Sequence, residues 1–501
     1  MNWEATTLGT VLAQQSANRG AAQALVTDRV RLTYSQLDHE ARQVAAGMQS
    51  MGLKHGDHIG ILMGNDADWI RLFYGAAILG CVTVPVNTRF KASELSFCLA
   101  QAGCKALFFA GTFLNIDYAA MVAGIRPQLP GLMHAVETSA GLPRGMPSSD
   151  LGAGVKPADP LLIQFTSGTT AYPKGVVLTH DNMLRNAWAA GSRFGIRAED
   201  RYYNCRPFFH VGGSTLSALA SLVFGACLVT LPSFEAGAVL KMLETERCTL
   251  TSGNDTIFQM LMGHAQFDPK KLCLRGGWAA AGPQTMRRII DVMGAKEICA
   301  AYGLSEASPN VVMSDWRDPE ALRVDGLAKP LEGVEVRIRD GEIQVRGWNV
   351  MRGYYNDPEQ TAKAFTDDGW LRTGDLGALT EDGRLRMAGR LKDVFRVGGE
   401  NVAPAEVEEV LLAHPAVQTA QVVGVPDIRL GEVPCAYVTL KDGMPATEAD
   451  LMAWAKGRCA NFRVPRYLRI VENFDSIGMT ASGKVQKVKL REHALREFGL
   501  G

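Results

Sequence analysis

The sequence predicts an α/β protein with a large N-terminal domain of doubly wound sheets, a small β-rich subdomain and a smaller α+β C-terminal domain. Three observations support this prediction. The chain has 501 residues, which is enough for more than one domain. Helical and strand-like segments alternate from about Tyr34 to Glu320, the βαβα pattern of a mostly parallel sheet. After Gly326 this alternation gives way to short β segments.

The N-terminal part contains short apolar runs that predict buried strands, at residues 58–63 and 106–109. Residues 70–86 read as an apolar helix, a turn at Gly80 and a strand. Residues 211–234 carry no charge and are long enough to span a bilayer. However, glycine and serine dilute this segment and Gly225 divides it, so a buried helix followed by a buried strand is the favoured interpretation.

The C-terminal part predicts a different arrangement. Residues 334–338 and 342–346 form a predicted β-hairpin with Asp340-Gly341 as its turn. Beyond Leu391 we expect an α+β unit, with helices at 405–413 and 488–498 and strands at 419–424 and 433–440. The joint is expected within residues 389–393, which divides the chain into domains 1–390 and 391–501.

The amino-acid composition limits the kinds of binding partner and the cellular compartment that we expect. Lys plus Arg equals Asp plus Glu, at 52 each, so no overall field attracts nucleic acid or an anionic membrane. A small-molecule partner is therefore the default expectation. Ten scattered cysteines without a Cys-x-x-Cys pair predict reduced, mostly buried thiols. The first residues do not resemble a secretory signal, so the cytoplasm is the expected compartment.

A loop rich in hydroxyl groups, residues 166–175, lies between two apolar strands at 161–165 and 176–178. Its backbone N–H groups, its hydroxyls and Lys174 could surround phosphate oxygens. The Walker spacing is absent, and a plain surface turn is the alternative interpretation of this loop alone.

Several motifs in a fixed order identify a family resemblance. They are the loop above, then Tyr302-Gly303-Leu304-Ser305-Glu306, Gly353-Tyr354-Tyr355-Asn356, Thr373-Gly374-Asp375, Gly389-Arg390-Leu391-Lys392-Asp393, Gly398-Gly399-Glu400-Asn401 and Ser482-Gly483-Lys484. Over nearly its whole length the chain resembles the adenylate-forming superfamily, which includes acyl-CoA synthetases, peptide-synthetase adenylation domains and beetle luciferases. The resemblance implies that a carboxylate attacks the α-phosphate of ATP and that the acyl group then passes to coenzyme A.

The resemblance also implies a role for individual residues in binding ATP. Glu306 would hold Mg²⁺ and act in catalysis, a coordination in which one carboxylate joins substrate phosphates. The ribose would bind Asp375 and Arg390, and Tyr302 would stack on the base. Phosphate contacts are expected from Thr166, Ser167, Thr169, Thr170, Lys174 and Ser305, and further nucleotide contacts from Gly168 and Gly303. The adenine loop is expected at Ala280, Ala281, Gly282 and Pro283.

The C-terminal domain would supply the remaining functional groups. Lys484 matches the catalytic lysine that bridges the carboxylate and the α-phosphate. After adenylation this mobile domain would rotate about Lys392, and Gly398, Gly399 and Glu400 would then line the pantetheine tunnel. Lys487 and Lys489 are interpreted as solvated surface charges.

His210 matches the position that gates the acyl pocket and is a further catalytic candidate, although a buried core histidine is the alternative. No acidic residue lies between Arg201 and Phe234, which argues against an amino-acid substrate. Trp278 is expected to shorten the pocket and favour a compact, uncharged acyl, alicyclic or aryl acid. The other pocket candidates are Val211, Gly212, Pro309, Asn310 and the 254–262 helix.

The sequence departs from the family pattern in three places: Ala171 in the phosphate loop, Gly478-Met479 where a Leu-Pro or similar pair usually precedes the lysine motif, and Leu430 near the expected CoA nucleotide. These departures affect the geometry of the two loops and the docking of CoA. Three alternatives stay open: an acyl-AMP ligase that loads a carrier protein, a luciferase-like monooxygenase and a non-catalytic nucleotide-binding relative. The segment 326–389 lacks an obvious insertion, which favours CoA over a carrier protein. A homodimer is left open as the oligomeric state.

Overall fold

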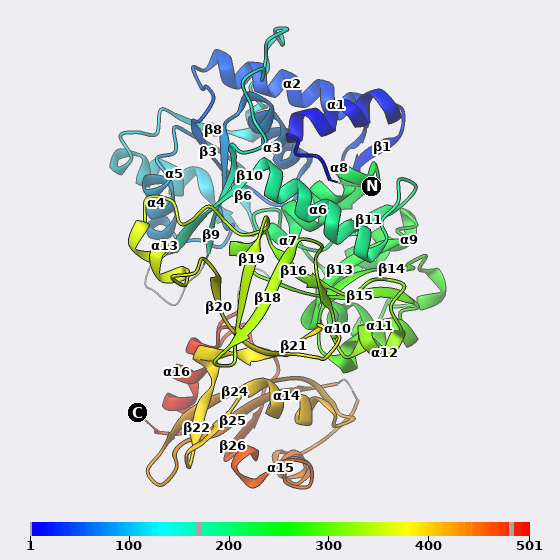
Figure 1. The fold of residues 1–501 in the computed structure, drawn as a ribbon, viewed down its shortest axis with the longest axis vertical. Helices are drawn as coiled ribbons and strands as arrows, with labels where there is room; N and C mark the ends of the chain where they lie inside the picture. The colour runs from blue at the N-terminus through cyan, green and yellow to red at the C-terminus, as the bar shows by residue number, and fades with distance from the viewer. Residues whose placement is uncertain (1–2, 167–172, 442, 480–484, 501) are drawn as a thin grey trace.

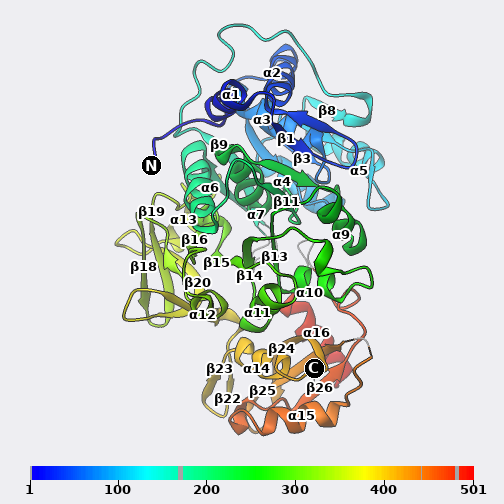
Figure 2. The same ribbon diagram turned by 90° about the vertical axis from the view of Figure 1, so that its right-hand side faces the viewer.

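The structure is a computed structural model that describes residues 3–166, 173–441, 443–479 and 485–500. Figure 1 shows a large N-terminal part and a smaller C-terminal part at its lower end. Figure 2 shows the smaller part lying beneath the helices α10 and α11 of the larger part. The predicted fold class is confirmed.

The largest sheet has nine strands in the order β17-β16-β15-β14-β13-β11-β12-β1-β2. Its central strands are parallel, whereas β1 and β2 at one end and β15, β16 and β17 at the other pair antiparallel. The strand bounds, in sheet order, are Lys329–Pro330, Asn310–Met313, Glu297–Gly303, Gly276–Ala280, Leu250–Asn254, Arg201–Asn204, Cys227–Thr230, Gln23–Val26 and Arg31–Thr33.

A second sheet has six strands in the order β10-β9-β4-β3-β5-β8. All its neighbours are parallel except β9 and β10, which form the hairpin that flanks residues 167–172. The strand bounds, in sheet order, are Lys174–Thr179, Pro160–Thr166, Val82–Pro85, His58–Leu62, Ala106–Phe109 and His134–Glu137. Two further short strands, β6 and β7, pair with each other at Thr112–Phe113 and Ile116–Asp117.

Helices lie between and around these sheets, and the largest hydrophobic cluster joins residues of α1, α2, α3 and α6 to both sheets. The helix bounds from α1 to α13 are Leu8–Arg19, Tyr34–Ser50, Ala67–Leu79, Ala92–Gln101, Tyr118–Ile125, His180–Phe194, Val211–Gly213, Ala220–Phe224, Ala236–Thr245, Asp255–Gly263, Pro283–Asp291, Glu320–Val324 and Pro358–Ala364. A π-helix at Ser214–Leu219 continues α7 into α8. Short 3₁₀ turns lie at Arg126–Gln128, Thr138–Ala140, Pro269–Lys271 and Ser305–Ala307.

Local sequence explains where two of these helices begin and end. Asp66 caps the first turn of α3, and Gly80 ends the helix with φ +84°, a left-handed conformation that favours glycine. The expected turn at Gly80 is thereby confirmed.

Thr179 caps α6, whose first residue, His180, is 1% exposed. His180 Nδ1 accepts a hydrogen bond from Leu8 N at 3.2 Å and so joins α1 to α6, and burial lowers the pKa of His180 to about 4.

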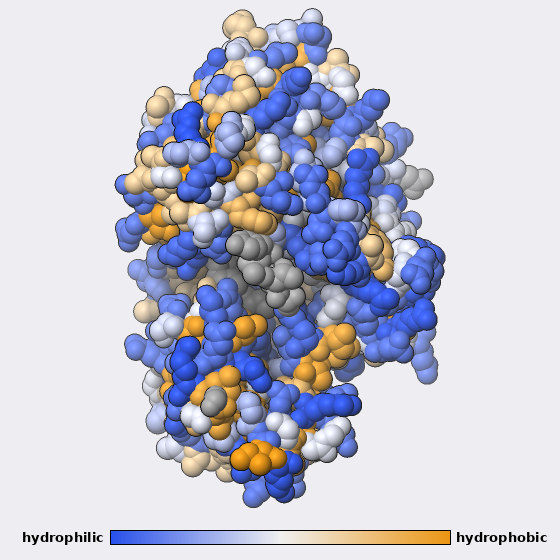
Figure 3. All heavy atoms as spheres, turned by 90° about the vertical axis from the view of Figure 1, so that its left-hand side faces the viewer, coloured by the Kyte–Doolittle hydropathy of each residue, from blue (hydrophilic) through white to orange (hydrophobic). Residues whose placement is uncertain are grey.

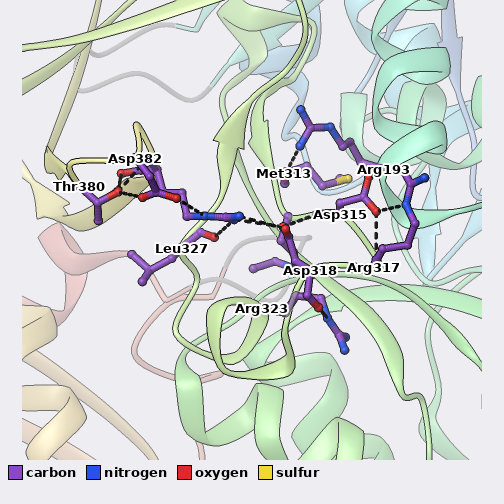
Figure 4. Close-up of polar contacts among 12 residues, drawn as sticks. Arg193, Met313, Asp315, Arg317, Asp318, Arg323, Leu327, Thr380 and Asp382 are labelled. Carbon is purple, nitrogen blue, oxygen red and sulfur yellow. Dashed lines mark hydrogen bonds and ion pairs between the residues drawn. The ribbon is translucent and has the colours of Figure 1, made fainter.

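The four-stranded sheet β18-β19-β20-β21 follows, at Val334–Arg339, Glu342–Gly347, Leu371–Leu379 and Leu385–Arg390. Asp340 and Gly341 both have positive φ, which confirms the predicted hairpin turn. A polar network joins this sheet to the nine-stranded sheet (Figure 4). Arg384 donates to both Asp318 oxygens at 3.0 and 3.1 Å, and Arg323 bonds the Asp318 carbonyl and the Ile298 carbonyl of β15.

The C-terminal part has its own core, which includes residues from Phe395 to Ala494. A 3₁₀ turn at Leu391–Asp393 precedes it, and a second lies at Asn461–Arg463. Strands β22 to β26 lie at Phe395–Val397, Glu400–Val402, Val417–Asp427, Gly431–Leu440 and Tyr467–Ile470, and helices α14 to α16 at Pro404–Leu412, Glu448–Lys456 and Lys487–Glu497. Each predicted helix and strand of this unit is present.

One expectation for this part was wrong. Lys487 is not a solvated surface charge, because its ammonium group pairs with Glu408 and donates to the Val422 carbonyl at 2.8 Å. Its side chain is only 19% exposed. A repeated basic pattern on a helix does not reveal which lysine meets an acid on a neighbouring helix.

All ten cysteines are free thiols; eight are buried, and Cys273 and Cys459 are half-buried. Burial raises the pKa of most of these thiols, for example to about 12 for Cys81. Among the described residues, no helix is both long and apolar enough to cross a membrane. The face shown in Figure 3 is mostly hydrophilic, with hydrophobic side chains in small separate groups.

Candidate active site

The carboxyl ends of β13, β14 and β15 bring together several predicted site residues. β13 ends at Asn254, β14 ends at Ala280 and β15 carries Tyr302 close to its end. Ligands of open α/β sheets bind outside the carboxyl ends of the parallel strands. Tyr302 and the predicted adenine loop that begins at Ala280 therefore lie at the edge where the fold places a ligand.

A buried carboxylate, Asp375 on β20, lies beside this edge and is 4% exposed. Tyr302 donates its hydroxyl to Asp375 Oδ2 at 2.8 Å, and Arg390 Nε lies 3.3 Å from Asp375 Oδ1. Burial and the negative charge of Asp375 raise the pKa of Tyr302, which keeps its hydroxyl protonated as a donor. The structure thus brings together the three residues expected to recognise the nucleoside.

Glu306 lies in the 3₁₀ turn that follows β15. Tyr354 donates its hydroxyl to Glu306 Oε1 at 3.0 Å, and Met351 N donates to the Glu306 carbonyl at 2.8 Å. Burial, followed by the charge of Glu306, raises the pKa of Tyr354. Tyr354 therefore remains a donor and fixes one oxygen of a carboxylate that has a second oxygen for a ligand.

The β9–β10 hairpin, which flanks the predicted phosphate loop, is held at its end by the segment around Tyr354. Tyr355 N donates to the Gly175 carbonyl at 2.7 Å, and Val177 N donates to the Gly353 carbonyl at 3.0 Å. Lys174 Nζ lies 5.1 Å from the centre of the Tyr354 ring and donates to Gln360 Oε1 at 2.7 Å. Lys174 is thus placed beside the Tyr354–Glu306 pair by contacts from both strands and helix α13.

The predicted adenine loop, Ala280 to Pro283, connects β14 to α11. Ala280 and Gly282 are exposed, so a ligand can approach their backbone. Gly282 N donates to Asp255 Oδ1 at 3.1 Å, which fixes the loop against the start of α10. Burial raises the pKa of Asp255.

The predicted acyl-pocket residues gather around Gly212. A Cβ atom at Gly212 would lie 3.2 Å from His210 Nδ1 and 3.8 Å from Trp278 Cη2. His210 Nδ1 accepts from Gly212 N at 3.0 Å, so the neutral ring carries its proton on Nε2. Trp278 is 3% exposed and donates to the Tyr202 hydroxyl at 2.7 Å. His210, Gly212 and Trp278 therefore lie close together.

The remaining pocket candidates are fully packed against their neighbours. Val211 is 0% exposed, and Pro309 is buried beside Asn310, which is 2% exposed. The backbone of Asn310 exchanges two hydrogen bonds with the Asn186 side chain, at 2.9 and 3.1 Å. This buried polar pair joins the strand β16 to the helix α6.

The predicted hinge and tunnel residues lie at the start of the C-terminal part. Lys392 is exposed within the 3₁₀ turn. Gly398 and Gly399 form the β22–β23 turn with φ +59° and +95°, and Glu400 follows them in an exposed position. Leu430 contacts this turn, because its carbonyl accepts from Gly398 N at 2.8 Å. The residue that departs from the family pattern thus supports the predicted tunnel loop.

Comparison with known proteins decides the family. Residues 12–355 match the AMP-binding enzyme family and residues 406–484 match the AMP-binding enzyme C-terminal domain. The chain belongs to the AMP-binding enzyme family.

Its relatives are similar over almost their whole length. The YngI protein of Bacillus subtilis, assigned as an acyl-CoA synthetase, is 36% identical over 99% of this chain and 98% of its own. The mitochondrial medium-chain acyl-CoA ligase ACSF2 of Rattus norvegicus is 34% identical over 96% of this chain and 86% of its own. The structure of the anthranilate CoA ligase AuaEII with anthranoyl-AMP is similar with a TM-score of 0.89, 25% identity and coverage of 99% and 98%.

Some of the expected functional residues of this AMP-binding enzyme cannot be placed. Ser167, Gly168, Thr169, Thr170 and Lys484 lie outside the described residues. Thr166 ends β9 opposite Lys174, and Ser305 and Gly303 flank the start of the turn that carries Glu306.

Three contacts of the AMP-binding enzyme site were not expected from the sequence. Tyr354 bonds Glu306 from 48 positions away, and Gln360 positions Lys174 from a distant helix. The third is Arg206, which stacks on Trp278 with 5.1 Å between its guanidinium carbon and the ring centre. A lone cation ahead of the Pro207-Phe208-Phe209 run was the signal available in the sequence.

Proposed function

We propose that this AMP-binding enzyme activates a compact carboxylic acid, of the acyl, alicyclic or aryl type, as its adenylate and passes the acyl group to coenzyme A. The reaction class is that of its relatives: it is an AMP-forming acid–CoA ligase that uses ATP and coenzyme A. Pyrophosphate leaves in the first step and AMP in the second.

The main observation behind the proposal is that two carboxylates, Asp375 and Glu306, are both linked to the end of strand β15. Tyr302, at the end of β15, contacts Asp375, and Glu306 follows four residues later in contact with Tyr354. Asp375 would accept hydrogen bonds from the ribose hydroxyls while the triphosphate extends toward Glu306 and Lys174. The site thus offers acceptors to the sugar and opposite charges to the phosphates and their cation.

Mg²⁺ is expected in this family, and the donors around Glu306 fit it. No group of three or more metal-ligating His, Cys, Asp or Glu side chains occurs among the described residues, so a protein-only cage is absent there. Mg²⁺ in nucleotide sites normally binds one or two carboxylates, water and phosphate oxygens. Glu306 would supply such a carboxylate, and the cation would neutralise the charge of the departing pyrophosphate.

Adenylate formation would be accelerated by the positioning of the two substrates and by the stabilisation of negative charge in the transition state. Lys174 from the large domain and Lys484 from the C-terminal domain would place positive charge near the phosphates, where it stabilises the transition state. The hydrogen bond from Gly212 N to His210 Nδ1 would fix the imidazole ring at the acyl pocket. The Nε2 proton would then point away from this hydrogen bond.

The second half-reaction would use the other face of the C-terminal domain. Rotation about Lys392 would remove Lys484 from the phosphates and bring the Gly398–Glu400 turn to the acyl-adenylate. The positive φ values of Gly398 and Gly399 support a turn without side-chain bulk, as a pantetheine tunnel needs.

The size of the acid is inferred from Trp278. Its buried ring lies close to Gly212 and is fixed by Tyr202, so it occupies volume that a long chain would need. Two relatives support a compact substrate, since ACSF2 is a medium-chain acyl-CoA ligase and AuaEII an anthranilate CoA ligase.

The test is the CoA-dependent release of AMP and pyrophosphate with short, medium, long, alicyclic and aromatic acids. Acyl-CoA should form with medium-chain or aromatic acids, and a C16 acid should give a lower kcat/KM. Faster turnover of the C16 acid would contradict the size inference. Parallel reactions with a phosphopantetheinylated carrier protein should give no acyl transfer; transfer to that protein alone would establish the carrier-loading alternative.

We further propose that the enzyme works in the cytoplasm, and a homodimer is the assembly to test. Fractionation of the source cells would check the compartment. Sedimentation at several protein concentrations would check the assembly.

A further inference from the structure

Arg206 is a buried cation for which no described residue provides a counter-charge. It is 8% exposed. None of the described residues accepts a hydrogen bond from its Nε atom, and none of the ion pairs between described residues includes it. Burial lowers the pKa of Arg206, yet an arginine remains charged in proteins. A charge in this position is costly unless an anion accompanies it.

The backbone around Arg206 is fixed, so the side chain is held at this place. The Arg206 carbonyl accepts from Asn65 Nδ2 at 2.8 Å and from Asn204 Nδ2 at 2.7 Å. Its own N–H donates to Asn204 Oδ1 at 3.1 Å. These contacts anchor the turn after β11, and none of them involves the guanidinium group.

The ionisable groups that act on Arg206 are neutral at physiological pH. They are the Cys205 thiol and the Tyr202 hydroxyl, and burial raises the pKa of each to about 12. No aspartate or glutamate occurs between Arg201 and Phe234, the stretch that contains β11, the π-helix and β12. Neighbouring side chains therefore do not balance the charge.

The face of Trp278 gives Arg206 partial compensation only. The guanidinium carbon lies 5.1 Å from the ring centre, a cation–π contact. Such a contact supplies no acceptor for the buried Nε–H donor, and the attraction is weaker than the penalty for burying an unpaired cation. An additional anion would therefore stabilise the buried charge of Arg206.

Arg206 also lies next to the proposed acyl pocket. Both residues approach the same indole: the Arg206 guanidinium carbon lies 5.1 Å from the centre of the Trp278 ring, and a Cβ atom at Gly212 would lie 3.8 Å from Trp278 Cη2 at the edge of that ring. A ligand group that passes the edge of Trp278 would reach the guanidinium from the acyl side. An arginine fork binds a carboxylate with two parallel hydrogen bonds.

We propose that Arg206 binds a second anionic group of the acid, so that the preferred substrates are dicarboxylic acids whose far carboxylate reaches the Trp278 side of the pocket. This inference rests on the proposed acid–CoA ligase function and refines its substrate class. It replaces the expectation of an uncharged acyl body with a compact acid that carries a charge at its far end. Arg206 is a specificity residue, since it touches a non-reacting part of the substrate.

Matched pairs of acids test the proposal. We would compare kcat/KM for hexanoate with hexanedioate, octanoate with octanedioate, and benzoate with benzene-1,3-dicarboxylate, measured as AMP release with ATP, Mg²⁺ and CoA. The wild type should prefer the dicarboxylate in at least one pair. Arg206→Met should reduce that preference by about 10- to 100-fold, the value of charged hydrogen bonds, with little loss on the monocarboxylate. Arg206→Lys should retain part of the preference.

A second measurement does not depend on turnover. If the arginine awaits an anion, Arg206→Met should leave the melting temperature of the ligand-free enzyme unchanged or raise it. Arg275→Met is the matched control, because Arg275 pairs with Asp200 and Glu297 and its removal should lower the melting temperature. The preferred dicarboxylate should also raise the melting temperature of the wild type and not that of Arg206→Met.

The outcomes separate this inference from the proposed function. Preference for the monocarboxylate in every pair, an unchanged ratio in Arg206→Met, or a fall in its melting temperature like that of Arg275→Met would each overturn the role of Arg206. Absence of AMP release with every acid would instead overturn the ligase function. In that case the dicarboxylate-dependent thermal shift still decides whether Arg206 binds an anion.

Discussion

Asp375→Asn should weaken ATP binding without unfolding the protein. Asp375 is 4% exposed, and its two oxygens face Tyr302 and Arg390. As a carboxylate it can accept from both ribose hydroxyls with charge-assisted bonds, each of which contributes about 1.5–3 kcal/mol. Asparagine has one acceptor oxygen, so it would lose one bond and weaken the other. The net loss is about 3 kcal/mol, or roughly a hundredfold in affinity.

The assay is ATP–pyrophosphate exchange with a preferred acid, from which the KM for ATP is obtained at saturating acid and Mg²⁺. Tyr302→Phe is the matched control, because it removes the 2.8 Å bond to Asp375 and retains an aromatic ring for the base. It should change the KM for ATP by less than about tenfold, since Asp375 keeps both of its acceptor oxygens and the bond that is lost does not involve the nucleotide. An unchanged KM in Asp375→Asn, with a folded protein, would refute the ribose assignment.

The remaining predictions concern catalysis and stability. Glu306→Gln should raise the Mg²⁺ concentration for half-maximal exchange and lower kcat by about a hundredfold; an unaltered Mg²⁺ titration would exclude Glu306 as a ligand. Lys484→Ala should reduce adenylation by roughly 100- to 1000-fold and spare thioester formation from supplied acyl-AMP; equal loss of both half-reactions would contradict this role. Lys392→Pro should impair only thioester formation, and normal overall turnover would argue against a hinge there. Because burial lowers the pKa of His180 to about 4, its stabilising effect is complete above about pH 6.5 and is lost as the pH falls toward 4. Between pH 8 and pH 5.5 the free energy of unfolding in urea should therefore fall by about 1 kcal/mol less in His180→Asn than in the wild type; identical losses would contradict the shifted pKa.

The sequence predicted the helices and strands well because their signals are local. The hairpin at Asp340-Gly341 follows from a turn that needs positive φ at both residues, and the end of α3 follows from Gly80. Hydrophobic runs without charge located the buried strands β3, β5 and β9 within one or two residues. Antiparallel pairing at both ends of the nine-stranded sheet was not predicted, since edge pairing depends on where distant strands meet.

The site was predictable where motifs carry the chemistry and unpredictable where long-range contacts do. Tyr302, Asp375 and Arg390 lie together as the family resemblance implied. The hydrogen bond from Tyr354 to Glu306 depends on a segment that joins β10 after nearly 180 intervening residues, and periodicity carries no information on such pairing. Arg206 was overlooked because a single arginine in an apolar run does not show from sequence whether it meets an acid.

The burial of the thiols affects how this enzyme can be assayed. A reagent such as Ellman's disulfide reacts with thiolates, and burial shifts the pKa of a typical cysteine here, such as Cys81, to about 12. Only Cys273 and Cys459 are half-buried, while the other eight are enclosed by the fold. The colour produced in a native reaction mixture should therefore report free coenzyme A with little background from the polypeptide. The same mixture in guanidinium chloride should titrate ten additional groups per chain.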